Sequence, residues 1–226
     1  MKKDYESLKQ CPLFCGIEEN NFPDVLTCLD ARERQYQKGE TVFSEGSPAS
    51  DIGVLLAGKV QIVRLDYYGN RSILTTVVPT QIFGEAFACT ALKEFPVDVV
   101  AAEACRVLLL NAARLVHSGS CGCAFHDRLL FNLLNIMARK NLVFHRKIEI
   151  TSKRSTREKL MTCLLMEAKA NGSSTVTLPY NRQELAGYLE VDRSGLSAEI
   201  GKLRKERVLE CHKSTFTLLP GKDRSR

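Results

Sequence analysis

The sequence predicts a mixed α+β protein, with an antiparallel β-roll or jelly roll, a long helix, and a C-terminal helix pair with a hairpin wing. Three observations predict this fold class. Short strands separated by glycines fill residues 32–110, an apolar heptad pattern runs through 124–150, and two short helices joined by a tight turn occupy 181–206. Many short strands indicate a roll or barrel, and a heptad repeat indicates a long helix. The expected domains are residues 1–120, 121–152 and 153–226.

The composition indicates a soluble, intracellular chain. It begins with the charged run MKKDYESLKQ, and no apolar run approaches the roughly 18 residues that a membrane span needs. We therefore expect a cytoplasmic protein with no membrane segment. Residues 1–150 hold 17 Lys+Arg and 17 Asp+Glu, whereas residues 151–226 hold 15 Lys+Arg and 9 Asp+Glu and so carry the whole net charge of +6. A basic segment suits a phosphate backbone, although a solvated surface would show the same excess.

The nine cysteines are expected to be free thiols, because disulfides are rare in the cytosol. Cys105 and Cys163 lie among apolar residues and are interpreted as core residues. The thiols that could in principle ligate a metal or an iron–sulfur cluster are Cys11, Cys15 and Cys28. No CxxC pair accompanies them, and four scattered histidines show no metal-ligand spacing, so we expect no metal site. Cys121 and Cys123 form a pair that could respond to oxidation.

The N-terminal 110 residues predict short helices followed by the roll. Residues 4–30 read as short helices punctuated by Pro12 and Pro23. From residue 32 the pattern changes to strands rich in β-branched and apolar residues, with glycines between them where a positive φ costs little. The expected strands are 41–43, 52–56, 60–65, 72–78 and 97–101.

A regular apolar seam marks the helix expected over residues 124–150. Its members follow at steps of four, three, four, three and four: Leu130, Leu134, Met137, Asn141, Phe144 and Ile148. Such a seam favours a coiled coil between two copies, in which the lone polar Asn141 fixes the register. The alternative is one face of a monomeric bundle. A second apolar row is positioned to rest on the chain's own roll: Leu129, Leu133, Ile136 and Val143.

Capping signals delimit the helices after residue 152. Ser155 and Glu158 form a capping-box pattern that opens a helix over 156–170, and Asn171-Gly172 ends it. The strands expected around the helix pair are 175–178, 208–210 and 215–219. The last two form a hairpin wing.

The helix pair at 181–206 has its own signals. Asn181 and Glu184 form a capping box for a helix over 182–189, and Asp192 is an N-cap for a helix over 193–206. The apolar positions on the two helices are Leu185, Ala186, Leu189, Leu196, Ile200 and Leu203. Helix, tight turn and helix is the layout of a DNA-reading unit, although a generic helical hairpin shows the same pattern.

A roll, a seam helix and a winged helix pair, in that order, resemble the Crp/Fnr family of bacterial transcription regulators. The markers are KGE (38–40), FSEG (43–46), LLAGKVQIV (55–63), FGE (83–85) and NRQELAGYLEVDRSGLS (181–197). The resemblance implies a roll similar to cyclic-nucleotide-binding domains and a winged helix-turn-helix. It also implies a homodimeric, sequence-specific DNA-binding regulator. No paired acid/base site or nucleophile motif indicates an enzyme.

By this resemblance the second helix of the pair enters the major groove with its first turn. Arg193 and Ser194 would face base edges, with Gly195 and Ser197 alongside, and Arg193 can make a bidentate bond to guanine. The residues expected at phosphates are Arg182, Gln183 and Lys202, of which Lys202 could equally be solvated. A twofold dimer places its two recognition helices roughly 34 Å apart, so the operator should be an inverted repeat in double-stranded DNA. RNA polymerase is the expected partner if the regulator activates.

Two positions depart from the family pattern in the helix pair. Ala198 stands one turn into the second helix, where members often carry an arginine, so no operator sequence is inferred. Glu190 stands where the turn commonly has glycine. A positive φ at a non-glycine residue costs about 1 kcal/mol, which a fold can tolerate.

The nucleotide site of the cyclic-AMP-binding relatives is rewritten in this chain. Gly84 and Glu85 are present, but the Arg-Ser that holds the cyclic phosphate eleven residues on is replaced by Phe95 and Pro96. Neither side chain supplies a charge or a donor to a phosphate. We therefore expect that cyclic AMP is not the ligand.

The far side of that site is changed as well. Phe144 and His145 stand on the long helix where the relatives have small hydroxyl residues. A remaining pocket between roll and helix would be bounded by Phe83, Gly84, Glu85, Ala86, Phe95, Pro96, Val97, Phe144 and His145. It either takes a less polar effector or is collapsed. The cysteine spacing does not match the family's oxygen sensor, and the carbon-monoxide sensor's haem histidine has no counterpart, so no cofactor is expected.

A second class of function fits the same residues. The chain could be a ligand- or redox-sensing module whose basic C-terminal domain binds a protein. Salt distinguishes the two, because DNA binding weakens steeply with salt through counterion release.

Overall fold

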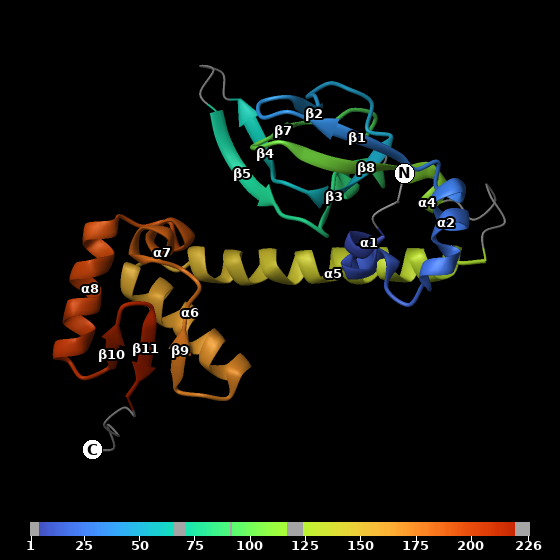
Figure 1. Cartoon of the computed structure of the whole chain (residues 1–226). Helices are drawn as coiled ribbons and strands as arrows, with labels where there is room; N and C mark the ends of the chain where they lie inside the picture. The colour runs from blue at the N-terminus through green and yellow to red at the C-terminus, as the bar shows by residue number, and fades with distance from the viewer. Residues whose placement is uncertain (1–4, 66–70, 91, 117–123, 220–226) are drawn as a thin grey trace. The chain divides into compact units, whose positions relative to one another are not determined.

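The computed structural model describes residues 5–65, 71–90, 92–116 and 124–219. The chain forms two compact units, Met1–Arg139 and Lys140–Arg226, and the division falls inside the long helix α5 (His126–Thr151). Each unit has a hydrophobic core. Figure 1 labels the helices and strands of both units. The boundaries expected at residues 120 and 152 stay a prediction. In the described part of the chain, no helix combines the length and apolar character needed to cross a bilayer.

The first unit contains the roll, which consists of two four-stranded antiparallel sheets in the orders β1-β8-β3-β6 and β2-β7-β4-β5. The strands are β1 (Arg32–Tyr36), β2 (Thr41–Phe43), β3 (Asp51–Ala57), β4 (Val60–Leu65), β5 (Arg71–Val77), β6 (Ile82–Phe83), β7 (Asp98–Ala101) and β8 (Cys105–Asn111). Residues from both sheets, among them Leu55, Val99 and Val107, share one buried cluster between them. The antiparallel roll that the sequence predicts is therefore confirmed.

One glycine in the roll makes room for a ring. Gly53 of β3 pairs with Phe83 of β6, and a Cβ added to Gly53 would lie 2.2 Å from the Cζ of Phe83. No real side chain tolerates that separation. The Phe83 ring of β6 can lie against the backbone of β3 because residue 53 has no side chain.

Short helices pack against one end of the roll together with the first part of α5. They are α1 (Glu6–Gln10), η1 (Pro12–Phe14), η2 (Glu19–Asn21), α2 (Phe22–Cys28), α3 (Glu85–Ala88) and α4 (Ala112–Val116). Leu129 and Leu133 of the predicted second row are buried in this cluster. Asn132 between them donates its amide to the carbonyls of Leu13 and Cys15, at 2.9 and 2.8 Å. α5 continues beyond this unit, but the buried part of the second row does not. Val143, the last member of the row, is exposed.

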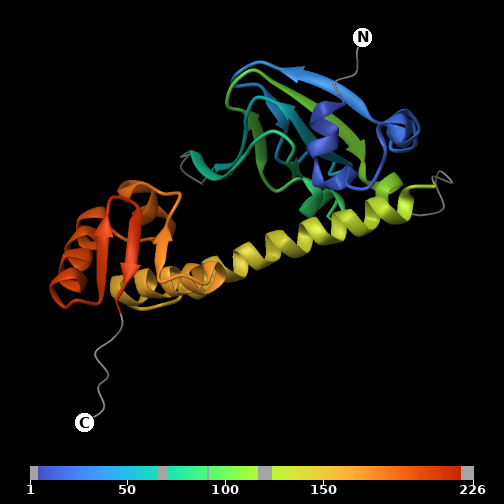
Figure 2. The ribbon, with the colours of Figure 1, turned by 60° about the horizontal axis from the view of Figure 1, so that its bottom comes forward.

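The second unit is a winged helix-turn-helix. Its elements are α6 (Thr156–Asn171), β9 (Thr175–Thr177), α7 (Arg182–Leu189), α8 (Arg193–Lys205), β10 (Leu209–His212) and β11 (Thr215–Leu218). The three strands form an antiparallel sheet in the order β10-β11-β9 beside the helices (Figure 2). Ile150 from the end of α5, Leu185 of α7, Leu196 of α8 and Phe216 of β11 share one buried cluster. The mixed α+β fold class is confirmed.

The predicted capping signals act as helix starts. The hydroxyl of Ser155 accepts the N–H of Glu158 at 3.2 Å, and the Glu158 carboxylate accepts the N–H of Ser155 at 3.0 Å. The backbone N–H of Ser155, and then its hydroxyl, which donates to the same carboxylate at 3.0 Å, hold the pKa of Glu158 below its ordinary value. Asn181 accepts the N–H groups of Gln183 and Glu184, both at 2.9 Å. Both helices therefore begin where the sequence predicts.

One expectation about the cysteines is wrong. Cys28, at the end of α2, is disulfide-bonded. The expectation of free thiols used the redox compartment alone, which carries no information about which thiols the fold brings together. Cys105 and Cys163 are buried free thiols, as predicted for core residues. The suggested redox pair, Cys121 and Cys123, lies outside the described residues.

Candidate DNA-binding surface

The recognition helix α8 is fixed in place by its buried face and by its N-cap. Leu196, Ile200 and Leu203 are buried in the core of the second unit. The Asp192 carboxylate accepts the hydroxyl of Ser194 and, at 2.8 Å, the N–H of Gly195. The hydroxyl bond and then the backbone bond hold the pKa of Asp192 below its ordinary value. The N-cap therefore fixes the first turn of α8. The side chains of α8 that are not on its buried face point away from the core of the unit.

The four residues expected near base edges lie together on this first turn. Arg193, Ser194, Gly195 and Ser197 are all exposed. The Ser197 hydroxyl donates to the carbonyl of Arg193 at 3.0 Å, and the Ser194 hydroxyl donates to the N-cap. Both hydroxyls keep acceptor capacity for a base edge, whereas Arg193 offers a full set of donors.

The outward face of α8 contains two residues that the sequence reasoning missed, Gly201 and Lys205. Ser194, Ala198, Gly201 and Lys205 follow at steps of four, three and four, opposite the buried leucines. Ala198 and Gly201 make this face small and uncharged, and Lys205 adds a cation at its end. The same spacing rule that identified the buried side could have found Lys205.

Of the residues expected at phosphates, two are exposed and one is not. Gln183 and Lys202 are exposed, and Lys202 forms an ion pair of 3.7 Å with Glu199. Arg182 is half-buried instead. Its guanidinium donates to the Sγ of Cys211 and to the carbonyl of Lys213, both at 3.4 Å.

Arg182 thus connects the start of α7 to the wing. The guanidinium also lies 5.6 Å from the ring centroid of Phe216, and its Nη1 atom is buried with no hydrogen-bond partner. Sequence reasoning could not find this contact, because it depends on where the wing returns in space. Lys213 at the turn of the wing is exposed, with a φ of 53°.

Two family models match the chain at these two units. The cyclic nucleotide-binding domain model matches residues 33–117, and the Crp-like helix-turn-helix domain model matches residues 158–220. The chain belongs to the Crp/Fnr family of transcription regulators. Its C-terminal domain is a DNA-binding helix-turn-helix, and the relatives described next are named as regulators.

Individual relatives agree with this assignment. The CRP-like cAMP-activated global transcriptional regulator of Mycobacterium tuberculosis is 32% identical over 82 residues, and the match covers 35% of each chain, so it spans about a third of that relative. The nitrogen fixation regulation protein FixK of Bradyrhizobium diazoefficiens is 24% identical, covering 91% of this chain and 88% of that one. The catabolite activator protein of Thermus thermophilus is 21% identical with a TM-score of 0.52, covering 92% and 93%, which shows the shared fold.

The interior of this Crp/Fnr roll is filled with phenyl rings. Phe95 is only 2% exposed and stacks on Phe43, with centroids 4.5 Å apart and an interplanar angle of 9°. Phe43 also packs against Phe83 at 5.5 Å, and Phe87 packs edge-on against Phe95 at 6.1 Å. Phe83, Phe95 and Val97, which the sequence places around a pocket, are therefore core residues of the roll.

The other expected pocket residues differ in burial and belong to different units. Gly84 has a φ of 81° and precedes α3, Glu85 is buried, and Ala86 and Pro96 are exposed. Phe144 and His145 are exposed and belong to the second unit. A pocket shared by all of them stays a prediction. Among the described residues, no three His, Cys, Asp or Glu side chains come together as metal ligands.

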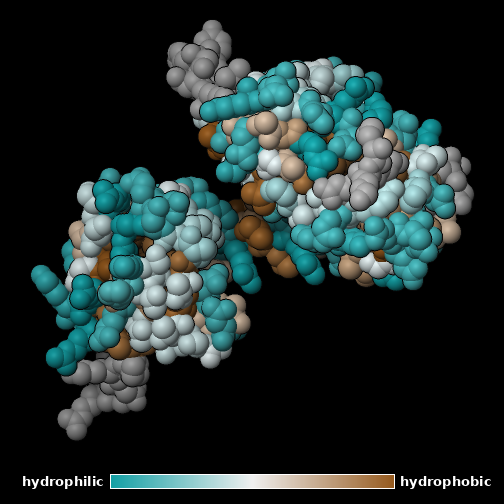
Figure 3. All heavy atoms as spheres, in the orientation of Figure 1, coloured by the Kyte–Doolittle hydropathy of each residue, from teal (hydrophilic) through white to brown (hydrophobic). Residues whose placement is uncertain are grey.

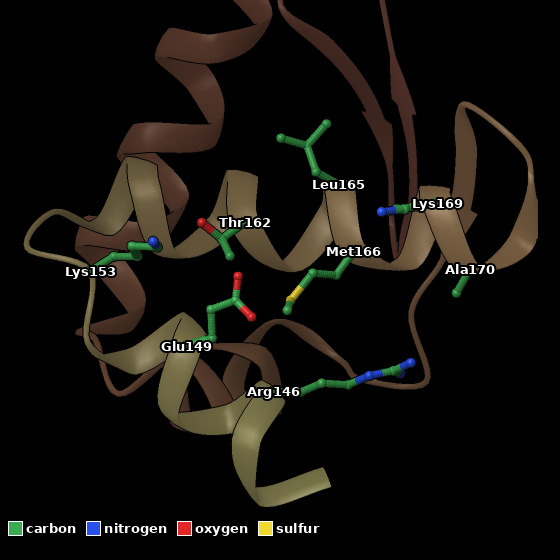
Figure 4. A pocket seen from close by; sticks show the side chains of 8 residues that line it. All are labelled: Arg146, Glu149, Lys153, Thr162, Leu165, Met166, Lys169 and Ala170. Carbon is green, nitrogen blue, oxygen red and sulfur yellow. The ribbon is translucent and has the colours of Figure 1, made fainter. Parts of the chain in front are cut away.

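A groove that the sequence did not predict lies within the second unit. It has a volume of about 710 Å³ and lies between the end of α5 and α6 (Figure 4). Glu149 of α5 and Met166 of α6 face each other across it. Three cations also line it, Arg146, Lys153 and Lys169, and this excess of positive charge adds to the basic character of the unit.

The predicted seam on α5 is largely exposed in a single chain. Leu134, Phe144 and Ile148 are 59%, 65% and 62% exposed, whereas Leu130 and Met137 are partly buried. Apolar side chains are visible at the surface along α5 in Figure 3. Large apolar side chains in such a row indicate an interaction surface.

Proposed function

We propose that this Crp/Fnr regulator is a homodimer that binds an inverted-repeat operator, and that it does so without cyclic AMP. The observation that carries the dimer is the exposed seam, in which Leu134, Phe144 and Ile148 share one face of α5 with Asn141. A heptad face of this kind gains stability when a second copy covers it, and one polar residue in the seam selects the register. Two copies of α8 then meet two half-sites.

In the proposed complex the bases are read mainly by Arg193. Its exposed guanidinium, in the first turn of α8, suits the O6 and N7 atoms of guanine. Gln183 and Lys202 would hold phosphates and set the register, and Lys205 joins them. Arg182 acts through the wing, because its guanidinium is occupied by Cys211 and Lys213.

Base reading by Arg193 is tested with Arg193→Ala. The operator is first selected from randomised duplex DNA, and the affinities are then measured by fluorescence anisotropy. The variant should lose about 1–3 kcal/mol of operator binding and relax its preference at one base position. Lys202→Ala is the matched control, since removal of a phosphate contact should weaken all sequences alike and reduce the salt dependence. An unchanged base preference in Arg193→Ala would show that α8 reads DNA through other residues.

The proposal that cyclic AMP is not the effector rests on the filled roll. Phe95, at the position of a phosphate-binding arginine in the relatives, stacks on Phe43 and offers no donor. Isothermal titration of the protein with cyclic AMP should give no saturable heat. Binding at micromolar or tighter concentration would overturn this part of the proposal. If the regulator activates transcription, RNA polymerase is its partner. The proposed site of action of the regulator is the cytoplasm.

We also propose that the protein works without haem or an iron–sulfur cluster. Of the N-terminal cysteines that could ligate a cluster, Cys28 is disulfide-bonded. Burial raises the pKa of the Cys11 thiol to about 11, so the thiolate that a cluster needs is scarce at neutral pH. Purified protein should show no absorption above 320 nm or so beyond the protein's own spectrum, and protein-bound iron would contradict the proposal.

A further inference from the structure

The end of α7 is held by two lysines from other helices. Glu190 follows α7 and has a left-handed backbone, with φ at 53° and ψ at 55°. Its carbonyl accepts from Lys159 of α6 at 3.3 Å, and its carboxylate pairs with Lys147 of α5 at 3.2 Å. Lys147 also donates to the carbonyl of Tyr188 in the last turn of α7. Cations at this position compensate the carbonyls that a helix C-terminus leaves unpaired.

The contact of Lys147 is more than a surface ion pair. Its side chain is 28% exposed and its ammonium lies 4.8 Å from the ring centroid of Tyr188. The Tyr188 ring also stacks on the ring of Tyr180, with centroids 4.9 Å apart. Lys147 thus makes three contacts with one site: a carbonyl, a carboxylate and an aromatic face. The polar contacts that the structure describes between α5 and the end of α7 are made by this residue.

The position of this site gives the contact a consequence for DNA binding. Glu190 belongs to the turn between α7 and α8, so a constraint on Glu190 also constrains the direction in which α8 leaves the turn. α5 is the helix that carries the seam of the proposed dimer. A link from α5 to the turn therefore sets where each recognition helix lies relative to the dimer axis.

We propose that Lys147 is a positioning residue that ties the helix-turn-helix to α5 and so sets the half-site spacing that the regulator accepts. The inference rests on the proposed homodimer and deepens it. One base pair of spacing changes the separation of the half-sites by about 3.4 Å and turns one relative to the other by about 35°. A firmly tied pair of recognition helices rejects that change, whereas a loosely tied pair adapts to it.

The test compares full-length variants on three duplexes. The operator selected by the wild-type protein is used alongside versions with one base pair added to or removed from its centre. Wild-type protein should lose at least about ten-fold in affinity on either altered duplex. Lys147→Met should bind the selected operator about five-fold more weakly, and its loss on the altered duplexes should shrink to about three-fold or less.

Three controls separate positioning from folding and charge. Lys153→Met removes the same charge a few residues along the chain and should keep the wild-type spacing preference. Lys147→Arg keeps a cation and should restore most of the preference. If Lys147→Met melts earlier by circular dichroism, Glu190→Gln replaces it, because this variant removes only the negative charge that faces Lys147. It should move the spacing preference in the same direction by less.

The outcomes distinguish the two proposals. If the wild-type protein selects an inverted repeat and Lys147→Met keeps the full spacing penalty, the positioning role is refuted and the dimer stands. If the wild-type protein selects no inverted repeat, the proposed function fails, and the role of Lys147 fails with it.

Discussion

The most direct test of the dimer is a single substitution in the exposed seam, Ile148→Ser. Complete burial of an isoleucine side chain contributes roughly 1.5–3 kcal/mol. Ile148 is 62% exposed in the single chain, so a partner can bury enough of it to gain roughly 1–2 kcal/mol. A twofold dimer contains the residue twice. The substitution should therefore cost roughly 2–4 kcal/mol of dimerisation free energy, which raises the dimer Kd by about thirty-fold to several hundred-fold.

The chain supplies a matched control for this substitution. Val143 is also β-branched, lies on the same helix and is 63% exposed, but it is about 140° round the helix from Ile148. Val143→Ser removes a comparable exposed apolar surface that the seam does not use. Its dimer Kd should stay within about three-fold of the wild-type value.

Sedimentation equilibrium over a wide range of protein concentration measures both constants. Circular dichroism spectra of the two variants establish that the helix is intact. The reasoning is refuted if Ile148→Ser dimerises as tightly as the wild-type protein, or if the two serine variants weaken the dimer equally. The second result would mean that apolar exposure on α5, and not the heptad seam, drives association.

Three further predictions concern the first unit. Asn132→Leu should lower the free energy of unfolding by about 2–4 kcal/mol in chemical denaturation, because two carbonyls of the N-terminal segment lose their donor. Gly53→Ala should lower the melting temperature by several degrees, since the new methyl group overlaps the Phe83 ring; equal melting temperatures would show that the ring can move aside. Iodoacetamide at pH 8 should label the exposed Cys15 and leave Cys11 unlabelled, because burial raises the pKa of Cys11 to about 11 and keeps it protonated. Peptide mass spectrometry distinguishes these sites, and labelled Cys11 in folded protein would contradict its burial.

Much of the fold was accessible from the sequence because local signals and tertiary packing agree. Both capping boxes start helices where predicted, and Glu190 has the positive φ expected from its position in the turn. One strand that was not individually predicted, β1, lacks such signals. β1 reads RERQY, with mostly exposed charged side chains, so it shows no apolar alternation. Its place in the sheet comes from antiparallel pairing with β8, which is a long-range contact.

The site was predictable in its charges and not in its contacts. The residues of the first turn of α8 are exposed together, as the helix spacing predicts. Arg182 shows the limit of this reasoning: its sequence neighbours give no sign that the wing returns beside it. Lys147 shows the same limit, since it lies about 40 residues from the turn that it contacts. A linear pattern identifies which residues share a helix face, and only the fold determines what that face meets.

The phenyl rings inside the roll also affect how such a regulator can be controlled. A bound metabolite stabilises a protein only in proportion to the logarithm of its concentration, by mass action. Phe43, Phe83 and Phe95 are covalent parts of the chain, so their stabilisation is the same in a starved cell as in a growing one. If cyclic AMP does not enter this roll, as proposed, the roll has no cyclic-AMP occupancy to vary. The number of copies of the protein, set by synthesis and proteolysis, would then be the quantity through which a cell adjusts the occupancy of its operators.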